Sequence, residues 1–401
     1  NNIVLSPTDF NPFEAEQRRI SSVSGNTVTL SSNLRYSHYG EIQYPTGDAS
    51  QPLDERGEVG LLSRNVTISG GPQDAVRGGH LMFIGASKIQ MSGVEVTGMG
   101  QRGTLGRYPI HFHHGFDAMN GSFVSNCSIH NNLQRSLVIH RTNGLTISDN
   151  VAFNTFGSQF YLEDGIETRN TFRRNLVVLT RFVPNEFRLS LVDGDGRNER
   201  QAAFWITNSA NTYEGNVAAG VENGFGYWFA GPDHETPDLP LYPEIQPMQP
   251  FNDNVAHAIA FREDSVFNLG YGPEQAGTGL FFEVISGYDQ EEGYNAPVRG
   301  FRASKCLNAA VWDDNYRPLE NIISADCRAG FINGQGRMFL MRIQDSMVVA
   351  RSANNPPTRN IVDYLTFGPF AGPVVFEQGG SEGVALDNVQ TIGQFEEPSF
   401  G

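Results

Sequence analysis

Apolar and polar residues alternate along several short segments of the chain, which is the pattern of β-strands with one buried face. The clearest segments are PIHFH (109–113), SLVIH (136–140), QFYLE (159–163) and AFWIT (203–207). One set of positions is apolar throughout and is expected to face a core: Ile110, Phe112, Leu137, Ile139, Phe160, Leu162, Phe204 and Ile206. The alternate positions are expected on an exposed outer face: His111, His113, Val138, His140, Tyr161, Glu163, Trp205 and Thr207.

These segments recur with a regular spacing. Each is followed, after a loop, by an asparagine that opens a second short strand, at Asn126, Asn150, Asn175 and Asn216. The first two intervals are 24 and 25 residues, and the third, of 41, contains an insertion at 181–200 that we expect in a long surface loop. A period near 24 residues with two or three short strands per unit is typical of a coil of a parallel β-helix. We expect the asparagines to stack as a hydrogen-bonded, structural ladder.

The pattern therefore predicts an all-β chain, a parallel β-helix with an N-terminal cap and long surface loops. Residues 1–60 are expected to form the entry cap, and 61–230 the core of the β-helix. A Pro-rich stretch begins at 231, and proline is excluded from regular central strands. We therefore expect 231–297 to hold a loop insertion and irregular coils, followed by C-terminal coils over 298–401.

Composition and charge narrow the functions. The chain of 401 residues has a formal net charge of −16, which argues against a general nucleic-acid binder because such proteins need a basic surface. The sequence contains no run of 18 apolar residues, so it predicts no membrane-spanning helix. The sequence starts without Met, so we expect a mature or excised form. Cys306 and Cys327 are about one coil apart, where either a disulfide or two buried thiols would fit.

Three of the nine histidines fall in the stretch RYPIHFHHG (107–115). Neighbouring parallel strands lie about 4.8 Å apart, so the repeat brings residues of successive coils into columns. The column of greatest chemical interest contains His113, His140 and Glu163, flanked by His111 and Asp164. His114 should alternate to the other face of its strand or begin a turn.

Imidazoles beside a carboxylate are typical of a metal site. We expect His113, His140 and Asp164 to bind a divalent metal, zinc or a similar transition ion. Two alternatives remain open. The histidines and carboxylates could act as acid and base without a metal, or the rings could stack without any ligand.

Aromatic and arginine residues around the column favour a carbohydrate. Tyr161, Trp205, Tyr227 and Trp228 are expected to offer flat faces to sugars. Eight arginines lie in one half of an otherwise acidic chain, where they could form a groove for a uronate polymer: Arg102, Arg107, Arg135, Arg141, Arg169, Arg173, Arg174 and Arg181. We expect Arg107, Arg135, Arg141 and Trp205 to contact substrate.

Longer stretches are similar to the β-helix region of the cell-surface and secreted hyaluronidase family, the group of the cell migration-inducing and hyaluronan-binding protein and of transmembrane protein 2. They are DERGEVGLLSRNVTISG (54–70), GRYPIHFHHG (106–115), the run 136–179 and AAFWITNSANTYEGNVAAG (202–220), with 3–20 resembling the segment before that β-helix. The family's H-x-H motif, later histidine and Glu-Asp pair correspond to His111, His113, His140, Glu163 and Asp164.

The resemblance implies a right-handed parallel β-helix, a secreted or cell-surface location, and depolymerisation of hyaluronan with a need for calcium. Calcium prefers oxygen ligands, so the histidines suit zinc better, and calcium would bind elsewhere or serve stability. The family's preceding Gly-rich domain is not in this sequence. If that domain supplies part of the active site, the chain is expected to bind without cutting.

Three functions remain open. The first is an endo-acting depolymerase of an anionic uronic-acid polysaccharide, working as a hydrolase with Glu163 or Asp164 as acid or base and His234 as a candidate partner. On the same face a lyase would use a histidine or Tyr161 to remove a proton beside a metal-bound carboxylate. The second is a non-catalytic glycan-binding module, and the third is a structural solenoid. We expect the protein to be a monomer.

Overall fold

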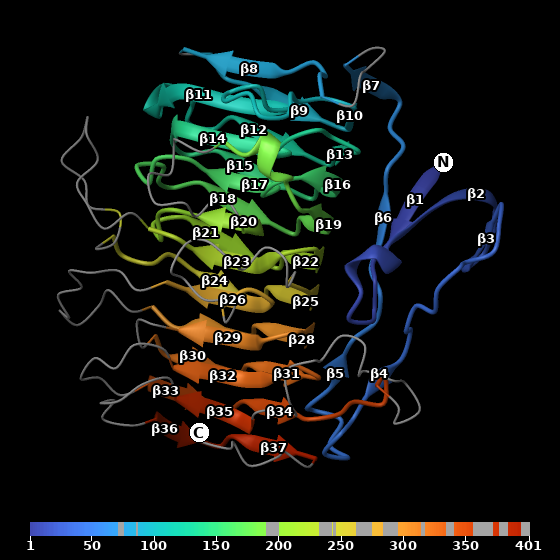
Figure 1. Ribbon diagram of the computed structural model, residues 1–401, viewed down its shortest axis with the longest axis vertical. Coiled ribbons are helices and arrows are strands. Elements are labelled where there is room, and N and C mark those ends of the chain that lie inside the picture. Colours follow the sequence, from blue (N-terminus) through green and yellow to red (C-terminus); the bar gives the residue numbers. More distant parts are fainter. Residues whose placement is uncertain are drawn as a thin grey trace.

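The chain winds into a parallel β-helix, in which every third strand joins the same sheet (Figure 1). The computed structural model describes residues 1–70, 76–85, 87–189, 200–231, 243, 246–261, 275–283, 296–313, 317–333, 341–355, 372–376 and 384–393. Within these ranges there is no α-helix, and the short 3₁₀ helices are η1 (Pro12–Glu14), η2 (Asp117–Met119) and η3 (Asn185–Phe187). None of the described helices has the length and apolar character needed to cross a membrane.

Three parallel sheets form the sides of the β-helix. Sheet I contains β8 (Leu81–Ile84), β11 (Ile110–Phe116), β14 (Leu137–Thr142), β17 (Phe160–Leu162), β20 (Gln201–Ile206), β23 (Gly224–Phe229), β26 (Thr278–Phe282), β29 (Ala309–Asp313), β32 (Ala329–Asn333) and β35 (Gly372–Phe376). Sheet II contains β9 (Gln90–Ser92), β12 (Phe123–Ser125), β15 (Thr146–Ser148), β18 (Thr171–Arg173), β21 (Thr212–Glu214), β24 (Phe251–Asn252), β27 (Val298–Arg299), β30 (Leu319–Glu320), β33 (Met341–Gln344) and β36 (Val384–Asp387). Sheet III contains β7 (Val66–Ser69), β10 (Val94–Thr97), β13 (Ser128–His130), β16 (Val151–Phe156), β19 (Leu176–Arg181), β22 (Val217–Val221), β25 (Val255–Ile259), β28 (Arg302–Cys306), β31 (Ile323–Ala325), β34 (Met347–Val349) and β37 (Gln390–Ile392).

The inward register predicted from the alternation is confirmed. Ile110 pairs with Leu137, which pairs with Phe160, which pairs with Phe204 in the next strand of sheet I. All eight residues of the predicted inward set are at most 1% exposed and belong to one apolar core. Burying such side chains drives folding, and a slip by one residue would turn them all outward.

The outer face of sheet I differs from its prediction, because much of it is buried under a second apolar layer. Val138, Tyr161, Trp205 and Trp228 occupy the same register position in successive strands and pack on one another. Their exposed fractions are 0%, 1%, 4% and 2%. Leu189, in the segment after β19, packs against this layer, and Val183 and Phe187 line a small cavity together with Tyr161 and Trp205.

The asparagine ladder is confirmed, with one change of register. Asn150, Asn175, Asn216 and Asn254 are buried, and each of the first three donates from its backbone and side chain to the amide oxygen of the next. Asn126 is not part of the ladder. Because Ser128 pairs with Val151, Cys127 takes the ladder position in that coil, and its N–H donates to Asn150.

The N-terminal segment runs beside the β-helix instead of closing its end (Figure 1). It contains an antiparallel sheet of β1 (Asn2–Leu5), β2 (Glu16–Ser24), β3 (Thr27–Leu30) and β6 (Val59–Leu61), and a pair of β4 (Ile42–Gln43) and β5 (Leu53–Asp54). Val4 packs on Val151 and Val178 of sheet III, whereas Leu53 packs on Met347, many coils further along. The segment therefore spans most of the length of the β-helix.

The remaining sequence predictions can be placed on this frame. Within 231–297, strands β24, β25 and β26 keep the parallel pairing of their neighbours. Most of the expected Pro-rich loop lies outside the described residues. Cys127, Cys306 and Cys327 are buried free thiols, so the alternative without a disulfide holds.

Replacing Leu162 by Ala should lower the free energy of unfolding by roughly 2–5 kcal/mol, because the side chain is fully buried and its loss leaves a cavity. Leu105, which is 50% exposed, is the matched control, and its replacement by Ala should change stability by less than about 1 kcal/mol. Urea titration of both variants measures the difference. Equal effects at the two positions would contradict the inward register.

Candidate functional site

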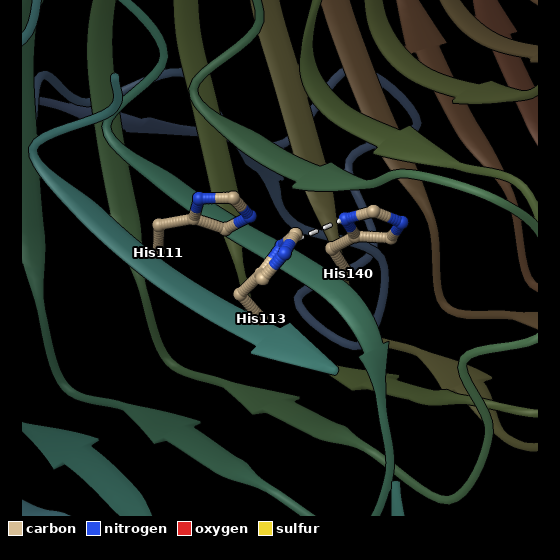
Figure 2. A group of neighbouring side chains, drawn as sticks. All are labelled: His111, His113 and His140. Carbon is tan, nitrogen blue, oxygen red and sulfur yellow. Dashed lines mark hydrogen bonds between the residues drawn. The ribbon is translucent and has the colours of Figure 1, made fainter. Parts of the chain in front are cut away.

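Two neighbouring strands of sheet I carry the histidines. In β11, His111 and His113 face outward because Ile110 and Phe112 fill the core. The parallel register with β14 places His140 directly beside His113. Figure 2 shows the three imidazoles gathered together above the two strands. The structure thus brings these histidines together as the repeat predicts.

The three rings are close enough to share one ligand. One ring nitrogen from each lies within 4.8 Å of the others. Nδ1 of His140 is 3.1 Å from Nδ1 of His113, and the rings of His111 and His140 are nearly parallel, with an interplanar angle of 6°. We call His111, His113 and His140 the histidine cluster.

Two carboxylates from the following coil contact the cluster. Oε2 of Glu163 lies 3.5 Å from Nδ1 of His140 and 3.7 Å from Nε2 of His111. Oδ2 of Asp164 lies 3.0 Å from Nε2 of His140 and also contacts Nε of Arg141. Glu163 therefore lies near Nδ1 of His140, the nitrogen that faces His113. Asp164 contacts the other ring nitrogen of His140, Nε2.

His111 forms the buried floor of the site. It is 1% exposed, and its Nδ1 lies 3.2 Å from the backbone oxygen of Gly106. This contact fixes the proton on Nδ1, which leaves a lone pair on Nε2. Nε2 is buried and has no hydrogen-bond partner within the part of the chain that the structure describes. Such an atom is a ready ligand for an ion.

His114 belongs to the site, contrary to the prediction that it would alternate to the other face or begin a turn. Its φ is 53°, and the pairing of β11 with β14 shifts between His113 and Phe116. This bulge turns the His114 ring onto His113, with centroids 4.2 Å apart, and against His140 at 4.6 Å. The following Gly115 was the sequence signal for an irregular backbone, but not for its direction.

Glu167 is a site residue that the sequence analysis missed. It is fully buried and accepts hydrogen bonds from the backbone N–H groups of Arg141, Asp164 and Gly165. It therefore holds the loop that carries Asp164 against β14. Its position three residues after Asp164 gave no periodic signal, because this loop lies outside the strands.

The electrostatics differ sharply within the cluster. Burial lowers the pKa of His111 to about 3 and that of His113 to about 4, so both are neutral near pH 7. Burial alone would lower the pKa of His140, but Asp164 and Glu163 raise it above the usual value. Burial likewise opposes the charge of Asp164, yet His140 and Arg141 lower its pKa to about 2. Asp164 is consequently a carboxylate at neutral pH.

Burial also raises the pKa of Glu167, to about 7. The nearby Asp164 carboxylate adds to this effect, and the backbone N–H groups oppose it. The two carboxyl groups of this loop thus ionise at well-separated pH values, which is common where acids and bases are assigned different tasks.

The expected aromatic and arginine platform is corrected by the structure. Tyr161 and Trp205 are buried and stack with centroids 5.3 Å apart, so neither presents a face to a sugar. Arg135 is also buried, with its guanidinium 3.6 Å from the centre of the Tyr161 ring. Tyr227 points into the inner core, because its strand pairs Tyr227 with the inward Phe204.

The other predicted contacts remain at the surface or cannot be placed. Arg107 and Arg141 are half-buried, beside His80 and Asp164 respectively. His113, His114 and His140 are half-buried too, and they form the open side of the site. His234 lies outside the described residues.

The fold and the site define a parallel β-helix protein with a histidine–carboxylate cluster on its outer face. Residues 76–262 match the model of the CEMIP beta-helix family, so this part of the chain is similar to the β-helix of that family. The resemblance noted in the sequence is therefore confirmed for the β-helix region.

The chain is similar to several longer proteins. The cell surface hyaluronidase CEMIP2 of Homo sapiens is 32% identical over 64% of this chain and 21% of its own length. A cell surface hyaluronidase of Danio rerio is 30% identical over 64% of this chain and 21% of its own length. A G8 domain-containing protein of Dictyostelium discoideum is 31% identical over 73% of this chain and 20% of its own length. The chain thus spans about a fifth of the relatives it matches.

Acid should destabilise the metal-free protein through His111. Its native pKa of about 3 lies below the value of about 6.5 in an unfolded chain, so between these pH values the unfolded state binds an extra proton. The free energy of unfolding should fall with decreasing pH across this window, by up to about 1.4 kcal/mol per pH unit from this group. Urea titrations in chelator, for the wild type and H111N, measure the slope. Identical slopes would contradict a buried, neutral imidazole.

Proposed function

We propose that the histidine cluster and Glu163 form the active site of an endo-acting depolymerase of an anionic uronic-acid polysaccharide, similar to hyaluronan. The observation that carries this proposal is the meeting of three imidazoles with a buried carboxylate on the outer face of a β-helix. The relatives named cell surface hyaluronidase support the substrate class. The reaction we favour is hydrolysis of the glycosidic bond.

A divalent metal held by His111, His113 and His140 is part of the proposal. Three imidazoles are a ligand set typical of zinc, whereas calcium prefers oxygen. The residues fit such an ion: Nε2 of His111 is buried and has no hydrogen-bond partner among the residues that the structure describes, and Gly106 fixes its tautomer from the other side of the ring. Asp164 would orient His140 through Nε2 instead of acting as a ligand, as carboxylates commonly do behind zinc-bound histidines.

When bound, the metal would supply a positive charge and an activated water at the open side of the cluster. Side chains of the protein would transfer the protons. Glu163 lies beside His111 and His140, and the hydroxyl of Tyr108 donates to its Oε1 over 3.4 Å. We assign Glu163 the transfer of a proton between water and the glycosidic oxygen. Asp164 is ionised by its pairing with His140 and Arg141, so it is unsuited to donate that proton.

Arg107 and Arg141 would attract the uronate groups. Both are half-buried, Arg141 beside Asp164 and Arg107 beside His80, and an arginine can bind a carboxylate with two hydrogen bonds. The buried Tyr161, Trp205 and Arg135 would support the floor from below. Elimination by a lyase is the alternative reaction on the same face, and the ultraviolet absorbance of an unsaturated uronate in the products would reveal it.

Metal binding should depend on the two half-buried histidines. The double change H113N and H140N removes two of three proposed ligands, so zinc should fall from one ion per chain to near zero. Elemental analysis after dialysis measures it. H130N is the matched control, because His130 contacts Glu95 on another sheet, and its zinc content should stay unchanged. Equal zinc in all three proteins would rule out the cluster as the site.

Replacing Glu163 by Gln should slow depolymerisation by roughly 10²–10⁴-fold while leaving zinc content unchanged, because the variant keeps the shape but cannot transfer a proton. Chain length of hyaluronan, followed by size-exclusion chromatography, is the measurement. E214Q is the control, since Glu214 pairs with Arg173 on sheet II. Wild-type protein that binds the polymer without shortening it would instead favour a glycan-binding module.

A further inference from the structure

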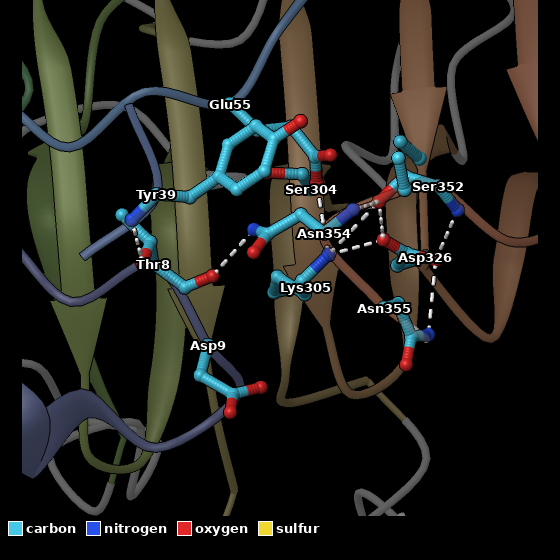
Figure 3. A network of polar contacts seen from close by, with 12 residues as sticks. Thr8, Asp9, Tyr39, Glu55, Ser304, Lys305, Asp326, Ser352, Asn354 and Asn355 are labelled. Carbon is cyan, nitrogen blue, oxygen red and sulfur yellow. Dashed lines mark hydrogen bonds and ion pairs between the residues drawn. The ribbon is translucent and has the colours of Figure 1, made fainter. Parts of the chain in front are cut away.

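A second cluster of charged side chains lies where the N-terminal segment meets the later coils. Lys305 is in β28, Asp326 follows β31, and Glu55 follows β5 (Figure 3). Their side chains are 1%, 0% and 2% exposed. Nζ of Lys305 lies 2.9 Å from Oε1 of Glu55 and also contacts Oδ2 of Asp326. An amine and a carboxyl group thus touch in a site without access to bulk water.

The β-helix itself brings these two groups together. Ser304 pairs with Ala325, so the next residues, Lys305 and Asp326, occupy successive rungs of the same turn. Both have positive φ, 55° and 53°, which gives their side chains the same direction. At the same turn in earlier coils the chain has Leu179, Gly220 and Ala258, which carry no reactive group.

The two oxygens of Asp326 have different surroundings. Oδ1 accepts hydrogen bonds from the backbone N–H of Ser352 at 2.9 Å and from Nδ2 of Asn355 at 3.0 Å. Oδ2 contacts Lys305 and accepts from the hydroxyl of Ser352 at 2.6 Å. Two N–H donors on one oxygen are the arrangement that stabilises the oxyanion of an acyl-transfer intermediate. The other oxygen, Oδ2, is placed to receive protons and to leave as water.

We propose that Lys305 and Asp326 join in an intramolecular isopeptide bond, with Glu55 as the proton carrier. In the resting state the amine is charged: burial opposes this, but Asp326 and Glu55 raise the pKa of Lys305. The reaction therefore begins with transfer of a proton from Nζ to Oε1 of Glu55. The neutral amine then attacks Cγ of Asp326, and negative charge gathers on Oδ1 between Ser352 and Asn355.

The step balances without any further reactant. The Nζ–Cγ bond forms and the Cγ–Oδ2 bond breaks. Two protons leave the ammonium group, and both depart with Oδ2 as water, one of them by way of Glu55. The amide keeps the third hydrogen on nitrogen. No oxidant, metal or cofactor takes part, and the product replaces two buried charges by a neutral group.

Folding would control the reaction. Lys305 and Asp326 become neighbours when the coils form, but Glu55 arrives only when the N-terminal segment docks. Gln43 holds Glu55 in place, because its Nε2 donates a hydrogen bond to Oε2 of Glu55 at 2.7 Å. The Oε1 atom of Gln43 accepts a hydrogen bond from the backbone N–H of Ala353. Holding the groups in reactive contact favours a step that is slow between free groups in water.

Mass spectrometry of the denatured wild-type chain tests the proposal. We expect a mass lower than that of the sequence by one water molecule. Trypsin locates the loss, because Arg317 precedes Pro318 and resists cleavage. A linked chain gives residues 303–328 as one looped peptide, since modified Lys305 is not cut. An unlinked chain gives 303–305 and 306–328.

Three variants complete the test. K305R and E55Q should each show the full sequence mass, and E41Q, which changes an exposed neighbour, should still lose water. Full mass in folded wild-type protein, established by circular dichroism and a cooperative unfolding transition, would overturn the proposal. So would a loss of water with normal cleavage after Lys305. Loss of water in E55Q would remove Glu55 from the reaction.

Discussion

The parallel register between neighbouring coils is the constraint on which the rest of the structure depends. Because side chains in a strand alternate, burying Ile110 and Phe112 forces His111 and His113 outward. Because β14 pairs in register with β11, burying Ile139 forces His140 to meet His113. The core therefore positions the chemical groups. A change of one residue in register would exchange the histidines with the apolar core and destroy both at once.

The second apolar layer contributes to the burial of part of the site. His111 and Glu163 are buried and contact Tyr108 of this layer, whereas His113 and Asp164 are only half-buried. This gradient explains why neighbouring imidazoles titrate at different pH values. Water exclusion disfavours a charged His111, and carboxylates favour a charged His140. At the buried end, Nε2 of His111 has no hydrogen-bond partner among the described residues.

The repeat and the alternation predicted the β-helix, its inward residues and the meeting of the histidines, because all three follow from a fixed period. The predictions were wrong or incomplete in segments that do not follow the repeat. The bulge at His114, the docking of Glu167 and the path of the N-terminal segment depend on contacts between distant residues. The burial of Tyr161 and Trp205 was missed for a related reason: alternation distinguishes two faces of a strand but not whether the outer one is covered.

This register gathers the imidazoles of His111, His113 and His140, and we propose that they bind one ion. Crystals soaked in zinc, with anomalous data collected at the zinc absorption edge, test it most directly. We predict one strong peak bounded by His111, His113 and His140, with Asp164 behind His140 and outside the coordination shell. A cluster without a peak, or a zinc ion bound elsewhere while His113 and His140 stay hydrogen-bonded to each other, would contradict it.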